Sequence, residues 1–148
     1  MNVAVAKAVK LSILSLPAHL PIVRAAAEKV CQMVGFDELQ IGKIVLSIDE
    51  ALTNVIKHAY GQTEDKPIDV ELIPTSKPVG LRICVRDYAD GVDVTEIRAR
   101  NVGQMRPGGF GVRIMNECMD SVEYALAPGG GTVLTMIKSI TGDDGGVG

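Results

Sequence analysis

Residues 37–61 read DELQIGKIVLSIDEALTNVIKHAYG, and this stretch decides the fold. Asp37 is followed three positions later by Gln40, which is the spacing of a capping box at a helix N-terminus. Gly61 follows the apolar residues at the other end, where a helix commonly stops. The stretch therefore predicts one long helix that ends at Gly61.

The polar side chains of this helix gather on one face. At about 100° per residue, Glu50, Asn54, Lys57 and His58 fall within a sector of roughly 100°. Because most of the remaining surface is apolar, the helix is expected to be largely buried, and its polar stripe must face solvent or a pocket. In a pocket, the carboxylate can accept a proton, the amide oxygen can bind Mg²⁺ and Lys57 can meet a phosphate. Both interpretations stay open at this stage.

The segments around the long helix indicate the fold class. Alternation or a 3.6-residue period predicts strands over 3–13, 67–74, 79–87, 121–127 and 131–140, and helices over 17–36 and 110–119. The order β-α-α-β-β-loop-α-β-β places strand pairs together instead of alternating them with helices. This order favours an α+β fold, a mostly antiparallel sheet with helices packed on one face. We expect one domain over residues 1–140 and a disordered polar tail over 141–148.

Composition excludes several classes of protein. The 148 residues carry 15 basic and 18 acidic side chains, a net charge of −3, so there is no clustered basic footprint for nucleic acid. No apolar run reaches the ~20 residues of a membrane-spanning helix, and we expect no membrane partner. The three cysteines are scattered and form no C-x-x-C pair, which argues against disulfides and zinc. We expect a cytoplasmic protein.

Three further segments carry candidate chemistry. In CVRDYADGVD (84–93), Asp87 directly follows an apolar strand, where a carboxylate can accept a hydrogen bond from an exocyclic amine, although Asp-rich turns are common. In RPGGFGVRIMN (106–116), glycines precede a helix start and leave room for phosphates. In GGGTVLTMIK (129–138), Thr132 begins a strand after a glycine turn. Neither a Walker P-loop nor G-x-G-x-x-G occurs.

In this order and spacing, the segments resemble a known family. DEALTNVIKHAYG (49–61), RDYADGV (86–92), GGFGVRIM (108–115) and GGGTVLTMIK (129–138) are similar to the N, G1, G2 and G3 boxes of the GHKL ATPase superfamily, which includes DNA gyrase and the histidine kinases. Within it, the sequence most resembles the small bacterial anti-sigma-factor serine/threonine kinases, over roughly residues 10–140. The resemblance implies a Bergerat-type two-layer sandwich that binds ATP and Mg²⁺ between helices and sheet.

The resemblance also implies roles for the residues of the N box. Glu50 corresponds to the general base, and Asn54 to the Mg²⁺ ligand of the nucleotide site. Lys57 and His58 lie where relatives place a basic residue near the phosphates.

The glycine boxes supply the remaining implied roles. Asp87 corresponds to the residue that binds the adenine amine, and Gly91 to the glycine that lets the base sit. Gly109 and Gly111 would cradle the phosphates, and Thr132 would support the adenine site. One position departs from the usual D-x-G-x-G pattern, because Ala89 replaces its first glycine. Alanine is tolerated there if its φ is negative.

The function implied by the resemblance is that of an anti-sigma factor and kinase. It would use ATP to phosphorylate a STAS-type anti-anti-sigma partner on serine or threonine, and would sequester a sigma factor as a homodimer. An alternative is a non-catalytic, nucleotide-gated partner-binding switch of the same fold. A histidine-kinase-type ATPase domain is disfavoured, because no phospho-accepting histidine segment precedes the domain in the sequence.

Overall fold

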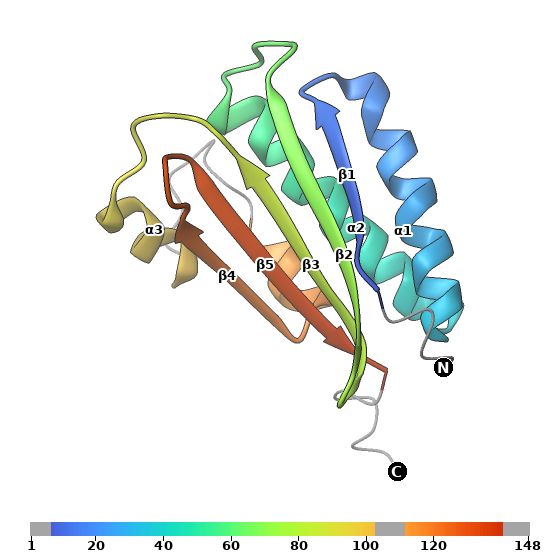
Figure 1. Ribbon diagram of the computed structural model, residues 1–148. Coiled ribbons are helices and arrows are strands. Elements are labelled where there is room, and N and C mark those ends of the chain that lie inside the picture. Colours follow the sequence, from blue (N-terminus) through green and yellow to red (C-terminus); the bar gives the residue numbers. More distant parts are fainter. Residues whose placement is uncertain (1–6, 103–111, 141–148) are drawn as a thin grey trace.

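A five-stranded antiparallel sheet forms one layer of the protein (Figure 1). The computed structural model describes residues 7–102 and 112–140. The strands follow the order β1-β2-β3-β5-β4, and each neighbouring pair is antiparallel. Their bounds are β1 Val9–Leu14, β2 Pro67–Ser76, β3 Val79–Asp87, β4 Ser121–Leu126 and β5 Thr132–Ser139. The α+β fold with a mostly antiparallel sheet is confirmed.

The helices supply the second layer, with α1 and α2 crossing one face of the sheet (Figure 1). Their bounds are η2 Pro17–His19, α1 Leu20–Val34, α2 Glu38–Asn54, the π-helix η3 Val55–Ala59, α3 Val94–Asn101 and α4 Arg113–Cys118. The short helix α3 lies beside the edge strand β4. The opposite face of the sheet carries no helix within the described residues.

The ends of α1 and α2 follow from local sequence chemistry. Gly35 ends α1 with a left-handed φ of 107°, which glycine adopts without a steric penalty. Asp37 begins α2 with a complete capping box, since its carboxylate accepts from the Gln40 N–H and the Gln40 side chain accepts from the Asp37 N–H. The capping box at Asp37 agrees with the sequence prediction.

The last turn of the long helix differs from the prediction. A regular α-helix to Gly61 was expected, but α2 ends at Asn54 and continues as the π-helix η3. The Tyr60 N–H bonds to the Val55 carbonyl, five residues back, instead of four. Single π turns occur frequently at functional sites.

The core lies between the helices and the inner face of the sheet. Alternate residues of β2 and β3 point into it: Ile68, Val70, Leu72, Leu81, Ile83 and Val85, all at most 2% exposed. The inner side of α1 is buried as well, at Leu20, Val23, Ala27, Val30 and Val34. Full burial of an aliphatic side chain contributes about 1.5–3 kcal/mol, so this interface is the main stabilising contact of the fold.

Candidate functional site

Two candidate residues meet where β3 ends and β5 begins. Asp87 and Thr132 are 3% and 2% exposed and lie 45 positions apart in the chain. The Thr132 hydroxyl donates to Asp87 Oδ2 at 2.6 Å, and the Ala89 N–H donates to Oδ1 at 3.0 Å. A carboxylate has about four acceptor positions, so each oxygen can still accept one more hydrogen bond. The pair is therefore a fixed, buried hydrogen-bond acceptor with the capacity to receive a further N–H group.

A glycine that the sequence did not single out sets this geometry. Gly131 has a φ of +81°, and a Cβ built on it would lie 2.0 Å from the Asp87 carbonyl oxygen and 2.7 Å from the Tyr88 Cα. Gly129 and Gly130 also have positive φ, but their Cβ positions meet nothing within 4 Å. The PGGG segment predicts a turn, but it does not reveal which glycine lies against the neighbouring strand.

The loop after β3 accommodates the departure from the glycine pattern. Gly91 has a φ of +87° with open space around its Cβ position, so the backbone conformation accounts for glycine there. Ala89 has a negative φ, since Gln62 and Asp65 are the non-glycine residues with positive φ in the described chain. The condition under which alanine is tolerated is therefore met.

The polar stripe of the long helix divides into a buried and an exposed part. Asn54 is 5% exposed, and its side chain interacts with the Tyr124 phenol. Glu50 is half-buried, and its carboxylate forms no hydrogen bond or ion pair in the same part of the chain. Lys57 and His58 lie on η3 and are exposed. Within the described residues, Glu50 thus has no polar partner, and it lies one turn from Asn54 on α2.

Tyr124 on β4 joins these groups and was missed by sequence reasoning. Its side chain is 5% exposed, and burial raises the pKa of its phenol to about 12, although the Arg100 guanidinium and the Asn54 side chain act to lower it and Asp87 adds to the rise. The guanidinium lies 5.2 Å from the ring centroid. At neutral pH the phenol is therefore a neutral O–H donor, close enough to Asn54 and Asp87 for its pKa to respond to both. From the sequence alone, Tyr124 is recognisable only as an inward-facing residue of a strand.

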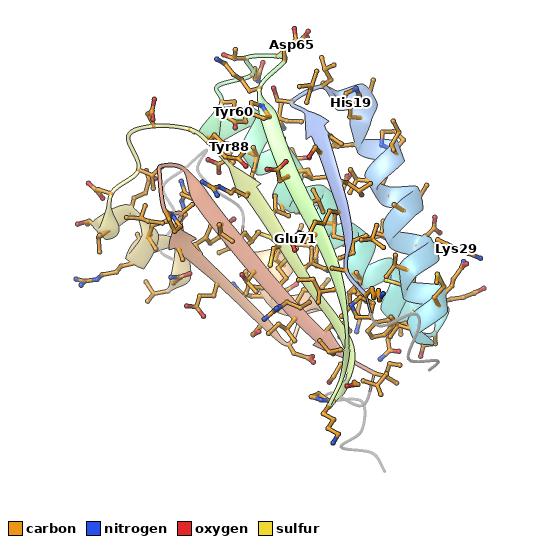
Figure 2. All side chains as sticks on the ribbon, viewed as in Figure 1. His19, Lys29, Tyr60, Asp65, Glu71 and Tyr88 are labelled. Carbon is orange, nitrogen blue, oxygen red and sulfur yellow. The ribbon has the colours of Figure 1, made fainter. Side chains whose placement is uncertain are left out.

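A second tyrosine fastens the end of the long helix to the loop after β3. The Tyr60 hydroxyl donates to the Pro67 carbonyl at 2.6 Å and accepts from the Tyr88 N–H at 2.8 Å. Figure 2 labels Tyr60 and Tyr88 at the same end of the sheet. Burial is the main cause that raises the pKa of Tyr60, so its hydroxyl stays protonated and keeps both contacts.

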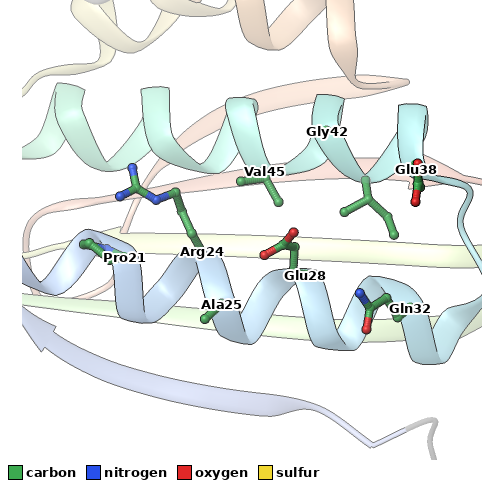
Figure 3. A pocket seen from close by; sticks show the side chains of 9 residues that line it. Pro21, Arg24, Ala25, Glu28, Gln32, Glu38, Gly42 and Val45 are labelled. Carbon is green, nitrogen blue, oxygen red and sulfur yellow. The ribbon is translucent and has the colours of Figure 1, made fainter.

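The groove between α1 and α2 is separate from these residues. It encloses about 510 Å³ and is lined by Arg24, Glu28, Gly42 and neighbouring side chains (Figure 3). None of the candidate site residues lines it. The groove therefore forms no part of the candidate site.

Other predicted features lie partly outside the described residues. Gly109 and Gly111, the expected phosphate cradle, fall within 103–111, and the tail 141–148 is also outside. Within the described ranges, no cluster of three His, Cys, Asp or Glu side chains could hold a metal ion. None of the helices described has the length and apolarity needed to cross a membrane. The three cysteines are free, but only Cys31 is buried, whereas Cys84 and Cys118 are partly exposed.

Comparisons with known proteins identify relatives of this chain. Residues 13–138 match the family model described as the histidine kinase-like ATPase domain. Serine-protein kinase RsbW of Listeria monocytogenes serovar 1/2a is 30% identical over 128 residues, which cover 80% of each chain. The protein of the same name from Bacillus subtilis is 26% identical over 135 residues, covering 86% of this chain and 82% of that one.

A solved structure has a similar fold. It is a crystal structure of the RsbU and RsbW domains of a Mycobacterium tuberculosis protein, and its TM-score is 0.66 at 18% sequence identity. The match covers 90% of this chain and 32% of that longer chain. At this identity the likeness concerns the fold.

Proposed function

The chain belongs to the histidine kinase-like ATPase domain family, and from this premise we propose that it is an ATP-dependent serine/threonine protein kinase and anti-sigma factor. Its curated relatives are named serine-protein kinases and match most of its length. The observation that carries the proposal is the buried Asp87–Thr132 pair. Tyr124 interacts with both Asp87 of this pair and Asn54 on α2. ATP binding follows from the family; the roles of individual residues are our proposal.

Asp87 would recognise the adenine base. Its carboxylate accepts from Thr132 and Ala89 and keeps acceptor capacity for the exocyclic amine of adenine. Guanine presents a carbonyl at the corresponding position, and an acceptor facing an acceptor leaves both unpaired. Gly91 would give the base room beside the loop. Gly109 and Gly111 would bind the phosphates through backbone N–H groups.

Glu50 would act as the general base. The serine or threonine oxygen of the protein substrate attacks the γ-phosphorus, the bond from that phosphorus to the β,γ-bridging oxygen breaks, and ADP leaves. The hydroxyl proton passes to the Glu50 carboxylate, which has no competing partner among the described residues. Most of the rate enhancement in such reactions comes from positioning and charge stabilisation.

Asn54 fits a Mg²⁺ site of the kind that nucleotides complete. Mg²⁺ commonly takes one or two protein ligands and fills the rest with phosphate oxygens and water, so one buried amide suffices. The ion would neutralise the charge of the phosphates when bound. Lys57 and His58 are exposed at the end of the same helix and would approach the phosphates from the solvent side.

The partners follow the same reasoning. We propose that the phosphorylated partner is a STAS-type anti-anti-sigma factor, that the sequestered client is a sigma factor, and that the kinase is a cytoplasmic homodimer. Phosphorylation would prevent the STAS partner from displacing the client.

Single-turnover phosphorylation of a candidate STAS domain tests this function. Glu50→Gln should keep ATP and partner affinity, while transfer falls by on the order of 10²–10⁴. Glu71→Gln makes the same chemical change on the uncovered face of the sheet and should transfer at the wild-type rate (Figure 2). Equal rates in Glu50→Gln and wild type would remove Glu50 from the mechanism. ATP-dependent partner binding without transfer in the wild type would instead favour the non-catalytic switch.

A further inference from the structure

Arg86 holds the glycine turn next to the candidate site from the far side of the sheet. It directly precedes Asp87 on β3, so its side chain points to the opposite face. Its Nη2 donates to the Pro128 carbonyl at 3.0 Å and to the Gly130 carbonyl at 3.3 Å. One guanidinium thus binds two carbonyls of the turn that joins β4 and β5.

This turn needs an external constraint because of its composition. Gly129, Gly130 and Gly131 all have positive φ, and glycine loses more conformational freedom on ordering than any other residue. Inside the turn, the Ala127 N–H bonds to the Gly131 carbonyl at 2.9 Å and the Gly130 N–H to the Ala127 carbonyl at 3.1 Å. Neither of these bonds ties the turn to β3. The two contacts of Arg86 do tie it to β3, at positions four and two residues before Thr132.

Arg86 is itself held in place on the outer face. Its guanidinium lies 4.5 Å from the centroid of the Tyr88 ring, a cation–π contact. The Tyr88 hydroxyl donates to Asp69 Oδ2 on β2, and the Ser12 hydroxyl on β1 donates to Asp69 Oδ1 at 2.9 Å. The side chains that fix the guanidinium therefore come from β1, from β2 and from the residue that follows β3, and Nη2 faces the two carbonyls of the turn.

We propose that Arg86 is a positioning residue for adenine recognition, acting through the glycine turn and Thr132 on Asp87. The proposal rests on the function proposed above, in which Asp87 binds the adenine amine. With Arg86 in place, Gly131 stays against the backbone of Asp87 and the Thr132 hydroxyl stays on Oδ2. Without it, the turn gains freedom and the acceptor loses its fixed orientation. Arg86 touches no nucleotide in this scheme.

Calorimetric titration with ATP and with GTP, in magnesium, tests the proposal. Arg86→Ala should weaken ATP binding about tenfold and reduce the preference for ATP over GTP, because charge-assisted hydrogen bonds that fix the acceptor are lost. Arg86→Lys should recover part of both, since a lysine keeps the charge but not the planar fork. Arg82→Ala is the matched control: Arg82 lies on the same face of β3, is exposed, and its side chain forms no hydrogen bond or ion pair with the described residues.

A double-mutant cycle with Thr132→Val separates positioning from general weakening. If Arg86 acts through Thr132, the double variant should lose little more ATP affinity than Thr132→Val alone. Additive losses, or an unchanged ATP:GTP preference in Arg86→Ala, would overturn the proposal. If Arg86→Ala does not fold, Arg86→Lys replaces it in the test. An ATP:GTP preference in Arg86→Lys equal to that of the wild type would then overturn the proposal. Failure of the wild type to bind ATP would refute the proposed function instead.

Discussion

Replacing Gly131 by alanine tests the close approach on which the candidate site depends. The new Cβ would lie 2.0 Å from the Asp87 carbonyl oxygen, 2.8 Å from its carbonyl carbon and 2.7 Å from the Tyr88 Cα. All three neighbours are backbone atoms, which cannot turn aside as a side chain does. The start of β5 must therefore move away from the end of β3, and the hydrogen bond from Thr132 to Asp87 is stretched or lost.

The expected loss of stability follows from separate contributions. An alanine in the left-handed region destabilises the folded state by about 1–2 kcal/mol. Alanine also has less conformational freedom than glycine in the unfolded chain, which offsets about 0.4–1 kcal/mol of that loss. Losing the hydrogen bond of Thr132 to the Asp87 carboxylate adds about 1.5–3 kcal/mol. Gly131→Ala should therefore lower the free energy of unfolding by about 2–4 kcal/mol, and ATP affinity should fall at least about tenfold.

Three other glycines provide controls for this measurement by urea denaturation and ATP titration. Gly129→Ala and Gly130→Ala share the positive φ but meet open space, so each should cost about 1 kcal/mol or less. Gly80→Ala brings a Cβ to 2.3 Å from the Lys138 carbonyl at the far end of β3, so it should destabilise the fold without changing ATP affinity. The reasoning is refuted if Gly131→Ala and Gly129→Ala are equally stable.

Three further outcomes are expected. The wild-type protein should bind ATP at least about tenfold more tightly than GTP. Asp87→Asn should weaken ATP binding, because the amide N–H group of asparagine would face another donor, either the Thr132 hydroxyl or the adenine amine. Equal binding of the two nucleotides in calorimetry would contradict this role of Asp87. Asn54→Ala should remove the dependence of ATP affinity on magnesium while leaving the thermal midpoint nearly unchanged, and a wild type that binds ATP equally well in chelator would count against the assignment. Burial raises the pKa of Cys31 from 9.0 to about 12, with a smaller contribution from Glu28. The free energy of unfolding should therefore fall as pH rises from 9 toward 12, since the unfolded thiol ionises first; urea denaturation of Cys31→Val should show a shallower pH dependence, and an unchanged slope would contradict the shift.

The elements of the fold were predictable from sequence because their signals are local. The capping box at Asp37, the left-handed Gly35 and the alternation in β2 and β3 each depend on residues within one element. The sheet order was not predictable in this way, since β3 pairs with β5 across 45 or more intervening positions. Local patterns indicate which segments are strands but do not specify their partners.

The sequence drew attention to Asp87 and Thr132, but not to the residues that support them. Asp87 and Thr132 belong to recognisable motifs, and the structure brings them together. Arg86 and Tyr124 appear in the sequence as ordinary strand residues, and their contacts depend on which strands and helices become neighbours. The π-helix after Asn54 has no distinct local pattern, so the sequence predicted an α-helix there. Such residues become visible only once the tertiary contacts are known.

The alanine in the first glycine position of the D-x-G-x-G pattern bears on the choice between kinase and switch. Ala89 is 9% exposed, has a negative φ, and its N–H donates to Asp87 Oδ1 at 3.0 Å. The backbone at this position therefore contributes an N–H to the acceptor and does not need the conformational freedom of glycine. A methyl group there leaves the Asp87–Thr132 pair intact, whereas Gly91 and Gly131 keep the positive φ that their turns require. The departure from the pattern thus gives no structural reason for weakened nucleotide binding. Because Glu50 on α2 forms no hydrogen bond or ion pair within the described residues, the kinase is the function to test first.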